Sequence, residues 1–378
     1  MTPSDQHFIP LTRPSLPDIN NVLENLRESY ASGTVTNGRL VKLFEEEVCR
    51  FTGARHAVAV SSCTSGLILA LASKRFPAHS EVIVPSFTFA ATVEAIVWND
   101  LTPVYVDCLP ETMTIDPGEV VRALGPDTAA VCPVNVFGLP PDVTSLTEIS
   151  ERYGLPLIFD SAQGLGSSFE GKASGCFGLC EAFSLSPSKV ITAIEGGLIT
   201  TDDTVTAERV QCMRDYGKSP DGDDMLFNGL SARMSELHAC VGLLNLRRAD
   251  ALISSRVRLI RRYAERLANM PGCKTQQLPA DRTTSGNYFT LLVGESAALP
   301  RDRLYEELKA RSIYTKKYYA MPVHAQTAFR DRPHRIVGDL RHTWAATTES
   351  LALPLYGHLT DQEQDRVCDA IESLLGGR

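Results

Sequence analysis

The sequence predicts an α/β protein built on a largely parallel sheet flanked by helices, followed by a smaller α+β unit. Short apolar runs alternate with helix-like segments through the first part of the chain, which is typical of parallel sheets. The pattern changes from about residue 271. A length of 378 residues suits one large domain and a smaller one, which we place at 1–245 and 246–378.

The composition is that of an ordinary globular protein, with 43% hydrophobic and 22% charged residues. A net charge of −8 gives no basic footprint for DNA or RNA. The opening residues lack the apolar segment of a secretory signal, and no apolar run reaches the ~18 residues of a membrane-spanning helix. The cysteines lack zinc-type spacing, so we predict reduced thiols and no metal site. We expect a cytoplasmic protein that binds neither nucleic acid nor membranes.

The first elements are an entry arm and helix within residues 1–32, and then a strand over 56–60. A hydroxyl-rich loop and an apolar helical run follow that strand. A helix N-terminus offers unpaired N–H groups and a partial positive charge, so it binds phosphate well. Thr64 and Ser65 would add hydroxyl donors. Plain N-capping is the alternative, although it accounts for one hydroxyl and not for the others of this loop.

Further strands are predicted over 81–85, 103–107 and 129–136, with helical segments between them. A short apolar run over 155–159 then ends on Asp160, at the carboxyl end of a strand, where α/β sheets place their ligand chemistry. The next apolar run, 182–185, leads to Lys189.

An Asp and a Lys in these positions suit a pyridoxal phosphate (PLP) site. The lysine amine forms a Schiff base with the cofactor aldehyde, and the acid keeps the pyridine nitrogen protonated. Two alternatives stay open on the residues alone. A lone loop lysine is commonly a solvated surface residue, and the glycine-rich segment could be a nucleotide loop. However, the segment 164–169 lacks the third glycine of G-x-G-x-x-G.

The segments FDSAQGLG and FSLSPSKVITAIEGGLIT resemble the signature of the DegT/DnrJ/EryC1/StrS aminotransferases. The family pattern is D-x-A-[HQ]-x-x-G, then F-S-[FL]-x-x-[ST]-K, then G-x-G-G. These are PLP-dependent transferases of fold type I, similar to aspartate aminotransferase, and act mostly on nucleotide-linked keto sugars. The resemblance implies that Lys189 forms the Schiff base and Asp160 pairs with the pyridine nitrogen. It also places Gln163 against the ring hydroxyl and Ser184 at the phosphate.

Two earlier segments extend the resemblance. SSCTSGL is similar to the family's S-G-T-x-A-L, with Cys63 and Gly66 as departures. The helix start is retained, so Thr64 and Ser65 stay assigned to the phosphate. PSFTFAAT resembles P-x-x-T-[FWY]-x-[AS]-T, which implies that Phe89 stacks on the pyridine ring. A buried core phenylalanine is the alternative.

FNGLSARMSE resembles the family's G-x-N-x-R-[ML]-x-[DE], a segment that crosses the dimer interface to the partner's PLP phosphate. Arg233 matches this motif, whereas Ser231 stands where Asn is usual. The resemblance implies a homodimer with shared active sites. The alternative is that Arg233 pairs with Glu236 or Asp215 on its own surface.

Residues 237–270 predict one long helix linking two domains, with an arginine run that we interpret as a solvated face. A strand over 287–293 and a helix over 301–311 belong to the smaller unit. The segment 315–324 resembles one ending in Y-x-x-P-x-H, which implies Tyr319 and His324 at the substrate mouth, although a lone histidine is more often structural. The resemblance covers essentially the whole chain.

The implied function is a PLP-dependent aminotransferase that cycles through pyridoxamine phosphate. The donor is an amino acid, glutamate, and Lys189 moves the proton as general base and acid. Similarity is greatest to members that aminate C4 of a dTDP-4-keto-6-deoxy sugar in antibiotic deoxyamino-sugar pathways. Amination of a keto-cyclitol or of C3 of a keto sugar is the alternative. Lys189 argues against the PLP-dependent dehydratase branch, and the length and charge argue against a DNA-binding regulator.

Overall fold

The computed structural model describes residues 8–376, so the first seven residues of the predicted entry arm lie outside it. Its helices are α1 (Ile19–Ser32), α2 (Arg39–Thr52), α3 (Cys63–Lys74), α4 (Ala90–Trp98), α5 (Pro117–Ala123), α6 (Val143–Tyr153), α7 (Thr204–Met213), α8 (Glu236–Leu246), α9 (Ala249–Leu267), α10 (Arg301–Ala310), η2 (Val323–Ala325), α11 (Arg341–Glu349) and α12 (Asp361–Leu375). Its strands are β1 (His56–Val60), β2 (Glu81–Pro85), β3 (Thr102–Val106), β4 (Thr128–Val131), β5 (Ile158–Asp160), β6 (Ser168–Phe169), β7 (Lys172–Ala173), β8 (Cys180–Ser184), β9 (Gly197–Thr201), β10 (Cys273–Thr275), β11 (Arg282–Thr283), β12 (Phe289–Val293), β13 (Arg335–Ile336) and β14 (Ser350–Leu353).

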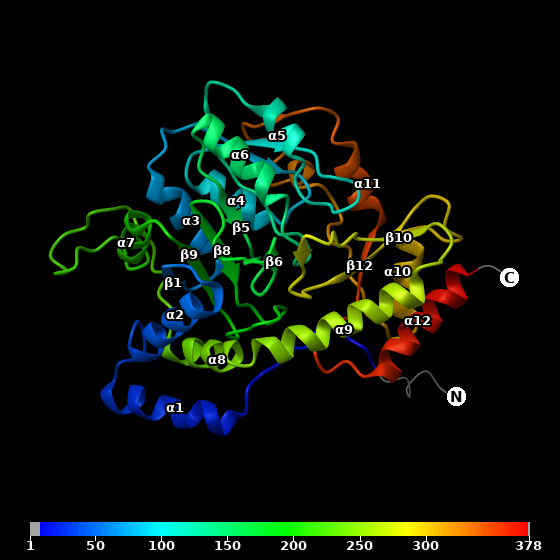
Figure 1. Cartoon of the computed structure of the whole chain (residues 1–378), viewed down its shortest axis with the longest axis horizontal. Helices are drawn as coiled ribbons and strands as arrows, with labels where there is room; N and C mark the ends of the chain where they lie inside the picture. The colour runs from blue at the N-terminus through cyan, green and yellow to red at the C-terminus, as the bar shows by residue number, and fades with distance from the viewer. Residues whose placement is uncertain (1–7, 377–378) are drawn as a thin grey trace.

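The centre of the larger part is a twisted sheet in two sections (Figure 1). Strands β13, β3, β2 and β4 form a wholly parallel section, and β1, β9, β8 and β5 form the other. Parallel bridges from Val131 to Leu157 and from Val134 to Asp160 join the two. Among these strands, β9 runs in the opposite direction and pairs antiparallel with both β1 and β8, because it returns from β8 without a crossover helix. The predicted mostly parallel sheet is therefore confirmed.

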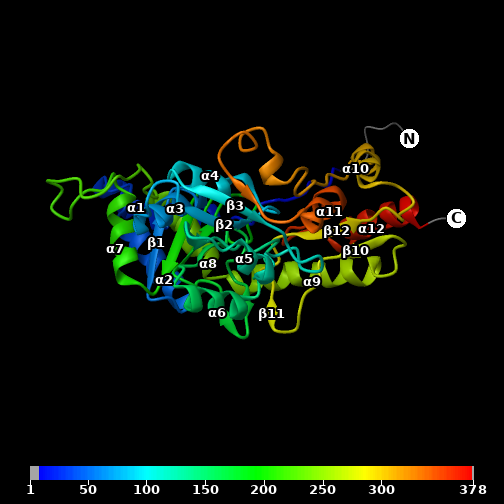
Figure 2. The ribbon, with the colours of Figure 1, turned by 90° about the horizontal axis from the view of Figure 1, so that it is seen from above.

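Helices cover both faces of this sheet. Figure 2 shows α4 on one side of the strands and α6 on the other. Alternation along the strands explains this layering, since successive side chains of a strand point to opposite faces. On β9, Ile199 packs with residues of α3 and α4, whereas Leu198 packs with residues of α2 and α8.

The smaller part surrounds the antiparallel sheet β10-β12-β14, to the right in Figure 1. Its core joins this sheet to α9, α10 and α12, and it includes Ile9 from the start of the described chain. The boundary that we placed between residues 245 and 246 falls in the last turn of α8 and stays a prediction.

The prediction of one continuous helix over 237–270 was wrong. Two helices, α8 and α9, occupy that stretch, and the chain turns between them at Arg248. The Asn245 side chain fixes this turn. It donates to the Thr192 carbonyl (2.7 Å) and accepts from the Arg248 guanidinium (2.7 Å). These hydrogen bonds of the buried Asn245 amide hold the chain in a turn between the two helices. The spacing of apolar residues gives no sign of such contacts, so it predicted one helix.

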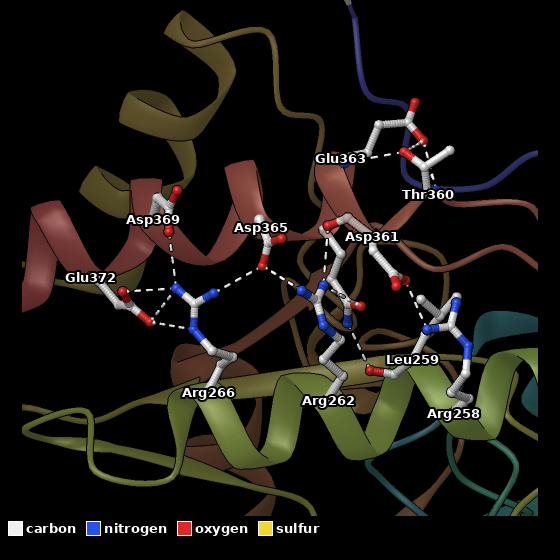
Figure 3. Close-up of polar contacts among 11 residues, drawn as sticks. Arg258, Leu259, Arg262, Arg266, Thr360, Asp361, Glu363, Asp365, Asp369 and Glu372 are labelled. Carbon is white, nitrogen blue, oxygen red and sulfur yellow. Dashed lines mark hydrogen bonds and ion pairs between the residues drawn. The ribbon is translucent and has the colours of Figure 1, made fainter.

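Arginines of α9 face acidic residues of α12 across the smaller part (Figure 3). Arg262 Nη2 lies 2.6 Å from Asp365, and Arg266 lies 2.9 Å from each of Asp365, Asp369 and Glu372. These side chains are partly exposed, so the arginine run is a solvated helix face, as predicted. Its charges form a network of ion pairs with α12, and networks stabilise more than isolated surface pairs do.

Within residues 8–376, no helix is both long and apolar enough to cross a membrane. The same part of the chain holds no group of three or more His, Cys, Asp or Glu side chains placed to bind a metal ion. All ten cysteines are free thiols.

Candidate active site

A cavity of about 200 Å³ lies where β5 and β8 end and α3 begins. The predicted site residues that line it are Thr64, Phe89, Asp160, Gln163, Ser184, Lys189 and Tyr319. The parallel pairing of β5 with β8 accounts for their meeting, since it sets Asp160 opposite Ala182 and brings both carboxyl ends to one edge. The cavity therefore unites most of the residues that the sequence motifs singled out.

Asp160 is a buried carboxyl at the floor of this site. Thr92 Oγ1 donates to its Oδ2 (2.6 Å), and the Ala162 N–H donates to its Oδ1 (3.0 Å). Burial raises its pKa, while these two hydrogen bonds and the Lys189 amine oppose the rise. In the described part of the chain it forms no ion pair. A buried carboxylate without a cation is costly, so a protonated ring nitrogen would suit this position.

Lys189 lies in a tight loop between β8 and β9. Its N–H donates to the Ser186 carbonyl (3.0 Å), and Leu185 pairs with both Gly196 (3.0 Å) and Ala193 (2.8 Å) to close the loop. The loop thus holds the lysine beside the carboxyl end of β8, on the cavity wall.

The N-terminus of α3 meets the cavity through Cys63 and Thr64. Ser62 and Ser65 form a capping box, in which Ser62 Oγ accepts from the Ser65 N–H (3.1 Å) and Ser65 Oγ accepts from the Ser62 N–H (3.1 Å). Ser65 does not line the cavity. The capping interpretation therefore describes Ser62 and Ser65, whereas Thr64 and the α3 N–H groups face the site.

A glycine at 197 lets β9 pass close to this helix start. A Cβ at Gly197 would lie 2.4 Å from the Ser62 carbonyl carbon and 2.5 Å from the Cys63 nitrogen, both backbone atoms. Any side chain would push α3 away from the sheet edge. The second glycine of the EGG segment thus sets the distance between the α3 N-terminus and the strands.

Gln163 and Phe89 form two further walls. Gln163 Oε1 is buried and has no hydrogen-bond partner among residues 8–376. Buried acceptors are normally paired, so this oxygen is free to accept a hydrogen bond from a ligand. Phe89 is 56% exposed, so it is not a core residue, and its ring centroid lies 6.3 Å from that of Tyr319. Its free aromatic face can stack on a flat ring.

Besides Ser65, two predicted site residues, Arg233 and His324, do not line the cavity. Arg233 donates to Asp215 (2.8 Å) and does not line the cavity, so of its two alternative partners the structure shows Asp215 and not Glu236. His324 is buried outside the cavity, with Nδ1 at 2.6 Å from Ser86 Oγ. The Val323 N–H bonds to the Ser86 carbonyl (3.1 Å) and turns η2 inward, which explains this placement. Burial lowers the pKa of His324.

The sequence reasoning missed Thr92, Ser188, Tyr288 and Tyr318. Thr92 contacts Asp160, and the other three line the cavity. The hydroxyls of Tyr288 and Tyr318 lie 3.3 Å apart. Tyr288 just precedes a strand of the smaller part, and no motif flanks it. The signal for Tyr318 was its position beside Tyr319.

These residues fit PLP. In the described part of the chain, an amine, a buried carboxyl that forms no ion pair, an amide oxygen without a hydrogen-bond partner, an exposed aromatic face and a helix N-terminus surround one small cavity. Each corresponds to one part of that cofactor: aldehyde, ring nitrogen, ring hydroxyl, ring face and phosphate.

A model of the DegT/DnrJ/EryC1/StrS aminotransferase family matches residues 18–372. The chain belongs to this family. It is therefore an aminotransferase, and the predicted family, reaction class and type I fold are confirmed.

Relatives with named activities are similar over nearly their whole length. A GDP-perosamine synthase from Caulobacter vibrioides is 31% identical over 94% of this chain and 94% of its own. A dTDP-4-amino-4,6-dideoxy-D-glucose transaminase from Escherichia coli is 30% identical over 97% of this chain and 98% of its own. The crystal structure of DesI in the presence of its TDP-sugar product superimposes with a TM-score of 0.91 at 33% identity, covering 99% of this chain and 94% of that one.

Proposed function

We propose that this aminotransferase uses PLP to transfer an amino group from L-glutamate to C4 of a dTDP-4-keto-6-deoxy sugar. One observation carries the proposal: Lys189 and Asp160 meet in a cavity at the α3 N-terminus. The names of the relatives support the substrate class: one is a GDP-perosamine synthase, another is a dTDP-4-amino-4,6-dideoxy-D-glucose transaminase, and DesI was crystallised in the presence of its TDP-sugar product.

The residues of the cavity would hold the cofactor as follows. Lys189 bonds its aldehyde carbon, Asp160 pairs with its ring nitrogen, and Gln163 Oε1 accepts from its ring hydroxyl. Phe89 covers the ring, and Thr64, Ser184 and the α3 N–H groups take the phosphate. When bound, PLP supplies an electron sink and carries the amino group as pyridoxamine phosphate between donor and acceptor.

Lys189 performs the proton transfers. With the cofactor bound, its amine would take a proton from one carbon and return it to another, as general base and then general acid. Asp160 assists because its buried carboxylate keeps the ring nitrogen protonated. Thr92 and the Ala162 N–H hold that carboxylate in place.

We further propose a homodimer with shared active sites. Lys189 is the sole basic residue among those that line the cavity in one chain. The α3 N-terminus offers only about half a unit charge to a phosphate that carries about two negative charges. Arg233 could supply the missing charge to a second copy, since guanidinium binds phosphate in a bidentate manner. The exposed Tyr216 ring lies 5.5 Å from the Arg233 guanidinium and adds an apolar surface beside it.

A panel of keto substrates tests the function. Purified protein with PLP and L-glutamate is assayed against a dTDP-4-keto-6-deoxy sugar, its GDP counterpart, a 3-keto sugar nucleotide and a keto-cyclitol, with products read by mass. We expect amination of the dTDP sugar, and a Lys189→Ala variant provides the blank. Preference for another acceptor refutes the substrate, and absence of 2-oxoglutarate with every acceptor refutes the transamination.

A further inference from the structure

A buried phenol from the smaller part of the molecule closes the cavity opposite the lysine loop. Tyr288 is 4% exposed and just precedes β12, whereas Lys189 follows β8 in the larger part. Both line the same cavity. The Tyr288 hydroxyl lies 3.3 Å from that of Tyr318, and Ser188, next to Lys189, also hydrogen-bonds to it.

A second cation lies behind this phenol. Arg256 of α9 is 1% exposed and donates from Nη1 to the Asn287 carbonyl (3.3 Å). Its Nη2 has no hydrogen-bond partner in the part of the chain that the structure describes, and no carboxylate there forms an ion pair with it. Burial lowers the pKa of Arg256 to about 10, so it stays charged at neutral pH, and the Tyr288 oxygen opposes that lowering. A buried cation without an acid stabilises negative charge on its neighbours.

The three tyrosines of the cavity are therefore not equivalent. Burial raises the pKa of Tyr318 and of Tyr319 above the usual value. Burial acts on Tyr288 in the same direction, but Lys189, the hydrogen bonds from Ser188 and Tyr318, and Arg256 outweigh it and lower the pKa. Among these three tyrosines of the described chain, Tyr288 is the one whose pKa is lowered by both Lys189 and Arg256.

We propose that Tyr288 is a positioning residue that shares a proton with Lys189. The inference rests on the function proposed above, in which the amine of Lys189 is released during turnover. In the exchange the phenol O–H bond breaks as a third N–H bond forms on the amine, which gives a phenolate beside an ammonium; the reverse step restores both neutral groups. The charge-assisted hydrogen bond of the ionic pair holds the amine in place between its two proton transfers.

A spectroscopic titration of the protein without cofactor tests the pair. Phenolate absorbance near 295 nm is followed against pH for the wild type and for Tyr288→Phe, and the difference isolates this phenol. We expect a midpoint below the ~10 of a free tyrosine. Lys189→Met should move the midpoint upward, because it removes one of the two cations. Tyr318→Phe is the matched control; it keeps both cations and should move the midpoint less. A midpoint above 10, or no response to Lys189→Met, overturns the proposal.

Steady-state kinetics test the consequence. Tyr288→Phe should lower kcat by about 10-fold or more, leave KM for glutamate within about 2-fold, and remove one limb of the pH profile of kcat. A low midpoint combined with an unchanged pH profile would show a perturbed tyrosine without a role in proton transfer and would overturn the proposal. A wild-type enzyme that forms no 2-oxoglutarate would instead refute the proposed function, while the titration still reports on the pair.

Discussion

Replacement of Glu181 by glutamine should stabilise the protein above neutral pH and not below pH 5. Glu181 lies on β8 and is fully buried, where it accepts hydrogen bonds from the N–H groups of Gly175 (2.5 Å) and Phe177 (2.8 Å) and from Ser161 Oγ (2.6 Å). No basic residue of the described chain forms an ion pair with it. A glutamine can keep both N–H contacts on its carbonyl oxygen and donate from its amide to Ser161.

The magnitude follows from the pKa of this carboxyl. Burial raises the pKa from 4.5 to about 7, against the opposing effect of the hydrogen bonds. A folded-state pKa above the unfolded value means that the stabilisation is complete below pH 4.5 and is lost as pH rises through about 7. At 1.36 kcal/mol per pKa unit, the ionised carboxylate costs about 3 kcal/mol of folding free energy at pH 8.

The assay is urea unfolding of the cofactor-free protein at pH 5, 6, 7 and 8, for the wild type and Glu181→Gln. We expect similar stability at pH 5 and an advantage for the variant that grows toward about 3 kcal/mol at pH 8. Ser161→Ala serves as a control. It removes a hydrogen bond that lowers the pKa of Glu181, so the loss of stability should still begin near pH 4.5 but continue to higher pH and become larger than in the wild type. A difference between wild type and Glu181→Gln that stays constant from pH 5 to pH 8 would refute the reasoning.

Four further outcomes are expected. Lys189→Ala should abolish steady-state turnover while the protein stays folded; near-wild-type activity would contradict its covalent role. Asp160→Asn keeps the shape of the side chain but cannot hold the ring nitrogen protonated, so kcat should fall roughly 10²-fold or more; a PLP-loaded variant with unchanged kcat would contradict this. Mixing Lys189→Ala with Arg233→Ala subunits should restore activity if Arg233 serves the partner's site, because each heterodimer then has one intact site; activity that stays low would place Arg233 in its own chain. Arg266→Met breaks the contacts to α12 shown in Figure 3 and should cost about 1 kcal/mol of unfolding free energy, less in high salt; an equal loss at low and high salt would exclude an electrostatic origin.

Sequence motifs were enough to predict the family, the type I fold, and those residues whose roles follow from their position along one strand and its loop. Asp160 and Lys189 are of this kind, because Asp160 follows one apolar run directly, Lys189 follows the next after a short loop, and the carboxyl ends of parallel strands share an edge. The start of α3 could also be predicted from the sequence, because the capping residue and the helix that it caps are adjacent in the chain.

Tertiary packing determines which distant segments of the chain meet at that edge. The structure places Tyr288 in the same cavity as Lys189, sets Thr92 against Asp160, buries His324 beside Ser86 and pairs Arg233 with Asp215. Apolar periodicity reports which face of an element is buried and not what covers it. A polar contact between residues far apart in the chain depends on the distances between their atoms in the folded protein. These distances result from tertiary packing and therefore cannot be predicted from the local sequence pattern.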